Sequence, residues 1–365
     1  MNKARDGQAA SGFANDEKVL HRYEELVDED DEVQALSCLA QALREGALPE
    51  LVATFKEALA TFGDTEVAYQ ICQKSAESNT QSGLLYSSLG ELAIALDRAP
   101  EAIDHFEKAQ ALGESGADLY QLWAGACVSL GEVEHGEELF STALEIAPDR
   151  VSEVYSAWGK ALCDAGFTKL AKEKLIVAIA ADERAFYPHA YLGVVHLQEA
   201  NEDLAQPAFQ RALELLPGGY ETYGAWIVLE LSNVMERRDG KEAAMGMICE
   251  QMQKGRRSMA LLERLRRLQN LTLGPGSKHF ILVVAGEDAK GDYYEECEVD
   301  ADSESAALDF VKAIHPGNEA ANLVIADAKV AGKAQGTLAG IVDLSDKTRV
   351  PAWNEPRPDE EDDDS

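Results

Sequence analysis

The strongest constraint on the fold is a pattern that recurs every 34 to 35 residues between Gly83 and Gly219. Four copies begin at Gly83, Ala117, Ser152 and Phe186. The first half of each copy carries an aromatic residue, a large residue and a small one, as in Tyr86, Leu89, Gly90; Tyr120, Trp123, Ala124; Tyr155, Trp158, Gly159; and Tyr191, Leu192, Gly193. The second half carries a small residue, a large one and an alanine, namely Ala102, Phe106, Ala109; Gly136, Phe140, Ala143; Ala171, Leu175, Ala178; and Ala205, Phe209, Ala212. Both halves have helical spacing, so each copy predicts two helices joined by a turn.

The alternation of small and large residues predicts how the two helices pack. Small residues at the eighth and twentieth places of the unit let helix A and helix B approach closely, and the large residue near the twenty-fourth fills the remaining gap. Gly131 and Gly166 would supply the positive φ that ends helix A. One such unit cannot bury its own apolar face, so neighbouring units must stack into a solenoid.

This pattern resembles the tetratricopeptide repeat family, clearly over about residues 49–219 and with degenerate units over 15–254. The resemblance implies a right-handed superhelix whose concave groove is lined by the second, fifth, ninth, twelfth and thirteenth places of helix A. Carried onto this sequence, the groove residues are Glu57, Glu91, Ile94, Ala95, Asp118, Gln121, Gly125, Val128, Glu153, Lys160, Asp164, Tyr187, Val194, Leu197 and Gln198.

The expected groove combines an apolar patch with acidic edges. The patch consists of Ile94, Val128, Val194 and Leu197. Such a surface suits a partner segment with apolar anchors and Lys or Arg around them. The alternative is that the protein's own helices partly fill the groove and that some of these side chains belong to the core.

One known role of the family is not expected here. Relatives that clamp the C-terminal carboxylate of the large heat-shock chaperones line the groove with lysines, an arginine and asparagines. In this sequence Lys160 is the only base at the groove places, and the fifth places hold Ala53, Ser87, Gln121, Ser156 and Ala190. The carboxylate clamp is therefore missing.

The rest of the chain divides by composition into further segments. Residues 1–15 are expected to be disordered, 16–268 to form the solenoid, 269–277 to be a linker, 278–346 to form a small α+β domain, and 347–365 to be a disordered acidic tail. Within the solenoid we expect helices over about 16–27 and 32–45, separated by the acidic run 28–32, and a capping helix over about 241–253.

In the small domain the periodicity changes to that of strands. Strands are expected over 279–285, 293–299, 323–330 and 338–344, with a helix over 303–314 that begins after an N-cap at Asp302. This order predicts a β-β-α-β-β fold with a sheet that is antiparallel in part. It resembles no family that we can name.

Residues 254–268 interrupt the acidic trend with six bases: Lys254, Arg256, Arg257, Arg264, Arg266 and Arg267. Leucines at helical spacing give the same stretch an apolar face. Three interpretations remain open, which are internal packing against acids of the same chain, a partner protein, and RNA or a membrane surface.

Composition limits the class of partner and the compartment. The chain has 33 basic and 66 acidic residues, for a net charge of −33, which argues against DNA and general nucleic-acid binding. It has no apolar run long enough to span a membrane and no secretory signal. Its six cysteines form no C-x-x-C pair, so we expect reduced thiols and a cytoplasmic protein.

The sequence shows no catalytic constellation. It has neither a P-loop, nor a G-x-G-x-x-G after a strand, nor a G-x-S-x-G elbow. His189 and His196 share a helix face, but no HExxH motif accompanies them, so no metal site and no cofactor are expected.

The resulting prediction is a non-enzymatic scaffold or adaptor that binds a partner protein. The alternatives are a dedicated chaperone, a self-assembling scaffold, RNA or membrane association through 254–268, and an enzyme in the C-terminal domain that shows no residue signature.

Overall fold

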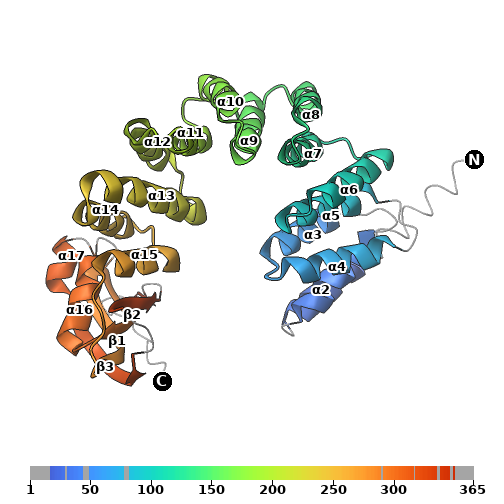
Figure 1. Ribbon diagram of the computed structural model, residues 1–365. Coiled ribbons are helices and arrows are strands. Elements are labelled where there is room, and N and C mark those ends of the chain that lie inside the picture. The colour runs from blue at the N-terminus through green and yellow to red at the C-terminus, as the bar shows by residue number, and fades with distance from the viewer. Residues whose placement is uncertain are drawn as a thin grey trace, which may run out of the picture. The chain divides into compact units, whose positions relative to one another are not determined.

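The computed structural model describes residues 17–28, 31–43, 49–77, 82–288, 291–315, 317–334, 338–345 and 348–349. The expected disordered N-terminus, residues 29 and 30 of the acidic run, and the acidic tail lie outside these described residues. Contacts within the chain form two compact units, the first ending at Arg184 and the second beginning at Ala185. Figure 1 shows the elements of each unit.

The first unit is entirely helical in its described part and contains the predicted repeats. A helix over 17–28 is followed by α2 (Glu32–Ala42), α3 (Pro49–Thr61), α4 (Thr65–Ala76), α5 (Gly83–Ala95), α6 (Ala99–Ala111), α7 (Ala117–Ser129), α8 (Val133–Ile146), α9 (Val151–Asp164) and α10 (Thr168–Ala181). The helix pairs α5–α6, α7–α8 and α9–α10 pack directly on each other. The predicted helix-turn-helix solenoid is thus confirmed.

Polar side chains fix where several of these helices begin. The side chains of Asp31, Asp64 and Ser82 accept hydrogen bonds from backbone N–H groups in the first turns of α2, α4 and α5. Each of these bonds satisfies an N–H that has no partner within its helix. The acidic run thus places a carboxylate at a helix N-terminus, as expected.

Small residues allow the close approach of helices A and B. A Cβ on Gly90 would lie 2.3 Å from Cε1 of Phe106, and a Cβ on Gly159 would lie 2.6 Å from a methyl carbon of Leu175. Both large side chains are fully buried. The alternation of small and large residues therefore packs helix against helix, as the sequence predicted.

The turn between helices A and B requires a positive φ at the fifteenth place of the unit. Gly131 and Gly166 adopt φ values of 84° and 83°, which confirms the prediction. Asp97 and Ala200 occupy the same place in their units with φ values of 60° and 54°. Two of the four turns are thus built without glycine, at the cost of an unfavourable backbone conformation.

The second unit contains the last repeat helices and the small α+β region. Its helices are α11 (Phe186–Gln198), α12 (Glu202–Leu215), α13 (Glu221–Asp239), α14 (Lys241–Gln253), α15 (Met259–Gln269), α16 (Glu304–Ala313) and α17 (Gly317–Asn322). Its strands are β1 (Lys278–Asp288), β2 (Gly291–Ala301), β3 (Val324–Lys333), β4 (Gly340–Leu344) and β5 (Thr348–Arg349). The helix expected over 241–253 is confirmed as α14.

The strands form one sheet in the order β3-β1-β2-β4, and β5 also pairs with β2. Every described pairing is antiparallel, and helix α16 packs on the sheet (Figure 1). The predicted strand and helix order is confirmed, with α17 and β5 as additions. The predicted N-cap is wrong by one residue, since the Ser303 side chain accepts the hydrogen bond from Ala306 N, while Asp302 accepts one from the Ser277 hydroxyl.

One apolar core runs through the second unit. It extends from Ala190 on α11 through α12 to α15 and into the sheet at Phe280 and Ile341. Residues 269–277, expected to be a linker, lie within this unit, where Thr272 bridges to Leu338. The α+β region therefore shares its core with the last repeat helices. Among the described helices, none combines the length and apolarity needed to cross a bilayer.

Candidate functional site

Helices A of the first unit present most of the predicted groove residues to solvent. We call the exposed and half-buried groove residues of α3, α5, α7 and α9 the A-helix face. Its members are Glu57, Glu91, Ile94, Ala95, Asp118, Gly125, Glu153, Lys160 and Asp164. Ile94 is 36% exposed and is the large apolar member of this face.

Val128 was predicted to line the groove, but it is fully buried. A Cβ on Gly136 of α8 would lie 2.5 Å from Cγ2 of Val128. The valine therefore fills the space above this glycine within its own helix pair. The prediction is wrong here because Gly136 in helix B has no side chain, and Val128 packs into the space that this leaves in the core.

Gln121 and Gly125 lie one turn apart on α7, and we call the position that they share the α7 notch. The Gln121 side chain is 9% exposed, and its Nε2 donor has no hydrogen-bond partner among the described residues. Gly125 lies one helical turn further on the same face, and a Cβ built on it would meet no described atom within 4 Å other than the neighbouring residues and backbone of its own helix. An unsatisfied buried donor costs about 1–3 kcal/mol, and because Nε2 has almost no accessible surface, a bound acceptor would recover that free energy only if the Gln121 side chain turned outward.

Glu91 gives the A-helix face a carboxylate with unusual electrostatics. Desolvation raises the pKa of Glu91, the nearby Asp118 raises it further, and Lys56 opposes both. The side chain nevertheless remains solvent-exposed. Glu91 is thus accessible to a ligand while the surrounding protein atoms displace part of its water, which strengthens its attraction for a cation.

Asp118 and Glu153 of this face already pair with Arg150, a base that was not among the predicted groove residues. Arg150 Nη2 lies 2.7 Å from Oδ1 of Asp118, and Arg150 Nε lies 2.8 Å from Oε2 of Glu153. These hydrogen bonds, with Glu153 first and Asp118 second, raise the pKa of the guanidinium. Arg150 was missed because it precedes the first residue of α9 and so lies outside the places of helix A.

Lys160 is similarly paired within its own helix. Its Nζ lies 2.6 Å from Oδ2 of Asp164, and both side chains are largely exposed. The A-helix face is therefore less acidic than its sequence suggests, because Asp118, Glu153 and Asp164 each contact a base.

The four predicted groove residues on α11 belong to the second unit. Val194 and Leu197 are half-buried against its core, Gln198 is exposed, and Tyr187 lies in an aromatic cluster. This cluster consists of Phe186, Tyr187, Tyr191, Tyr220, Tyr223 and Trp226. Of the four residues predicted to form the apolar patch, Ile94 is exposed, Val194 and Leu197 are half-buried, and Val128 is buried.

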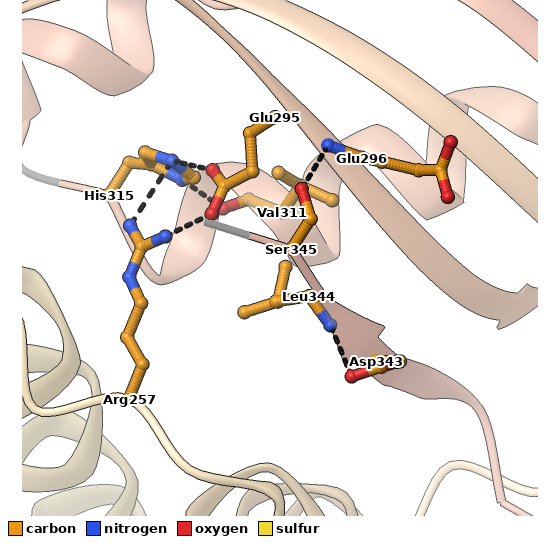
Figure 2. A network of polar contacts seen from close by, with 8 residues as sticks. All are labelled: Arg257, Glu295, Glu296, Val311, His315, Asp343, Leu344 and Ser345. Atoms are coloured by element: carbon orange, nitrogen blue, oxygen red, sulfur yellow. Dashed lines mark hydrogen bonds and ion pairs between the residues drawn. The ribbon is translucent and has the colours of Figure 1, made fainter. Parts of the chain in front are cut away.

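The bases of residues 254–268 are engaged within the chain. Figure 2 shows Arg257 reaching the buried carboxylate of Glu295, beside His315. Arg264 Nη2 lies 2.6 Å from Oε2 of Glu236, and Arg266 Nη2 lies 3.3 Å from Oδ2 of Asp300. Of the other three, Lys254 and Arg267 pair with glutamates one turn away, and Arg256 donates to Gln251 and to the Leu213 carbonyl. Of the three interpretations of this stretch, these contacts favour internal packing over RNA or membrane binding.

No protein-family model and no curated protein matches this chain. Among solved structures, a tetratricopeptide repeat protein from Parabacteroides merdae aligns over 70% of this chain and 98% of its own, with 14% identity and a TM-score of 0.50. The Cut9-Hcn1 hetero-tetramer structure aligns over 69% of this chain and 49% of its own, so the match spans about half of that protein, with 16% identity and a TM-score of 0.44. YrrB, described as having an unusual peptide-binding site, aligns over 54% and 93%, with 18% identity and a TM-score of 0.33.

Proposed function

We propose that this protein, whose repeats have the tetratricopeptide fold, is a non-enzymatic scaffold or adaptor. The A-helix face of its first unit would bind an extended segment of a partner protein, anchored at the α7 notch. The observation that carries this proposal is the buried Nε2 of Gln121, which has no acceptor among the described residues and belongs to the residue one helical turn before the open position at Gly125.

The notch fits a backbone or side-chain carbonyl of the bound segment. Such an oxygen would accept from Gln121 Nε2 after an outward rotation of the Gln121 side chain, while the missing side chain at Gly125 lets the segment approach the helix closely. No cofactor is needed for this kind of recognition.

The charge of the face indicates what should flank that carbonyl. Glu91 and Glu57 are exposed acids, whereas Asp118 and Glu153 already share Arg150. A Lys or Arg of the segment would therefore pair with Glu91, and a small apolar side chain would contact Ile94. A partner protein with a basic and apolar segment remains the proposed ligand class.

The proposal can be tested with a display library of extended peptides selected on the wild-type chain. The binding constants of the selected peptides would then be measured on Gly125→Trp, which fills the notch, and on Gly125→Ala, which leaves most of it open. We expect Gly125→Trp to weaken binding more than about 10-fold and Gly125→Ala to have little effect, while Gln121→Leu should cost roughly 10-fold through the lost hydrogen bond.

A matched control is Glu145→Trp, which adds the same side chain to an exposed position on α8. Binding that survives Gly125→Trp, or that Glu145→Trp reduces equally, would contradict the proposed site. Failure to select any peptide that binds better than its scrambled version would contradict the proposed function.

A further inference from the structure

The turn between α7 and α8 gathers three side chains of different metal-binding chemistry. Cys127 lies near the end of α7, Glu132 precedes the first residue of α8, and His135 lies in the first turn of α8. One ligand atom from each lies within 4.8 Å of the other two. Cys127 Sγ is 3.7 Å from His135 Nδ1, and this nitrogen is 3.8 Å from Oε2 of Glu132.

These distances match those between neighbouring ligands of a tetrahedral zinc ion. Zinc binds sulfur at about 2.3 Å, imidazole nitrogen at about 2.1 Å and carboxylate oxygen at about 2.1 Å. At a tetrahedral angle these bond lengths place sulfur and nitrogen about 3.6 Å apart, and nitrogen and oxygen about 3.4 Å apart. The two separations that involve His135 Nδ1 therefore differ from the tetrahedral values by only a few tenths of an ångström, and the exposed Glu132 side chain can adjust its distance to the sulfur, which lies within 4.8 Å.

We infer that this turn binds a divalent cation of the zinc class through Cys127 Sγ, His135 Nδ1 and a carboxylate oxygen of Glu132. Sulfur, imidazole and carboxylate together suit zinc, whereas calcium and magnesium take oxygen ligands. Three protein ligands leave a fourth position for water or for a group from another molecule.

Trp123 supplies an independent observation at the same place. Its side chain is 5% exposed, and its indole N–H has no hydrogen-bond partner that meets standard geometry among the described residues. This N–H is nevertheless close enough to the Cys127 sulfur to lower the pKa of the thiol, and the indole ring meets the His135 ring edge-on with centroids 6.1 Å apart. A metal-bound thiolate would give this buried donor a charged acceptor, which is how groups behind metal ligands commonly orient them.

The surroundings of Cys127 argue against a second use of the sulfur as a free nucleophile. Burial raises the pKa of Cys127 to about 11, and the carboxylates of Glu132 and Glu107 contribute in the same direction. Without a cation the sulfur is therefore a protonated thiol, which is a poor nucleophile.

The inference does not depend on peptide binding by the A-helix face. Its ligands were not recognised in the sequence because C-x4-E-x2-H is no common zinc spacing. Only the helix-turn-helix geometry, with Gly131 at the turn, brings the three residues together.

The test uses the full-length chain, purified without affinity-tag histidines, stripped with a chelator and kept reduced. Titration with Co²⁺ should give one equivalent of saturable binding and a thiolate-to-cobalt charge-transfer band in the near ultraviolet, and Zn²⁺ should abolish the band by displacement. His135→Ala and Glu132→Gln should each weaken Co²⁺ binding by at least about 10-fold. Cys127→Ser should remove the charge-transfer band.

Both His135 and Glu132 have largely exposed side chains, so these two variants should fold, which circular dichroism can check. The matched control is His21→Ala, whose side chain is 74% exposed and which lies outside this cluster. The absence of saturable binding, unchanged affinity in His135→Ala, or a charge-transfer band that persists in Cys127→Ser would each overturn the inference.

Discussion

The imidazole of His315 lies 2.8 Å from the carboxylate of Glu295, measured from Nε2 to Oε2, and neither side chain has solvent-accessible surface. Arg257 donates to the other oxygen of the same carboxylate, and His315 Nδ1 lies 2.8 Å from the Val311 carbonyl (Figure 2). This network joins the segment between α14 and α15, strand β2 and the end of α16. The basic stretch is thus a structural part of the second unit.

Arg257→Ala should strongly destabilise the second unit, because it leaves the buried Glu295 carboxylate without its guanidinium partner. Loss of one partner of a buried ion pair typically costs about 3–5 kcal/mol. The measurement is urea unfolding, with hydrogen exchange in peptides from β2 and α16 as the local probe of the second unit. Arg267→Ala is the control, since Arg267 and Glu263 form an exposed pair, and such pairs contribute at most about 1 kcal/mol. Equal losses in the two variants would contradict this account.

The sequence predicted the repeat helices well because their signal is redundant. Each helix pair repeats the same small and large residues, so one ambiguous position does not hide the period. In the C-terminal region the elements occur once, and the short ones were missed. Helix α17 and strand β5 are each too short to produce a period. Asp302 and Ser303 are both good N-cap residues, and local sequence does not decide between them.

The candidate site was only partly predictable, for a different reason. The position of a residue within its helix predicts whether it faces outward. It does not show which side chain of the next helix lies opposite. Val128 is buried because Gly136 lies opposite it, and Asp118 is neutralised because Arg150 reaches it from the following unit. The unsatisfied donor of Gln121 depends on the atoms around it and has no sequence signal.

Gly125→Ala should stabilise the first unit by about 0.5–1 kcal/mol, because alanine favours the interior of a helix and its Cβ would enter open space. Gly159→Ala is the informative comparison, because its Cβ would lie 2.6 Å from Leu175 and overpack the core. We expect that variant to lose about 1–3 kcal/mol. Thermal melts of both variants, followed by circular dichroism, would show opposite shifts. A loss of stability in Gly125→Ala would mean that the notch is not open.

Ala200→Gly should stabilise the second unit by about 1 kcal/mol. Ala200 adopts φ 54° at the turn between α11 and α12, where a Cβ is unfavourable and glycine is not. The gain is reduced by the greater backbone freedom of glycine in the unfolded chain. The reverse change, Gly166→Ala at the equivalent turn of the first unit, should lose about 1 kcal/mol. Urea midpoints of the two variants test the pair, and a shift of the same sign in both would refute the explanation.

Glu91→Gln should stabilise the chain at neutral pH and weaken its binding of basic segments. Because desolvation raises the pKa of Glu91 in the folded state, its ionised form is less favourable there than in the unfolded chain. The contribution of Glu91 to stability is therefore full below the ordinary glutamate pKa of 4.5 and is lost as the pH rises through the folded value. Relative to wild type, Glu91→Gln should gain stability at pH 7, and this gain should vanish as the pH falls below 4.5. Urea unfolding at several pH values would measure it, with Glu57→Gln as the control on the same face. A gain that is independent of pH would show that ionisation of Glu91 is not its source.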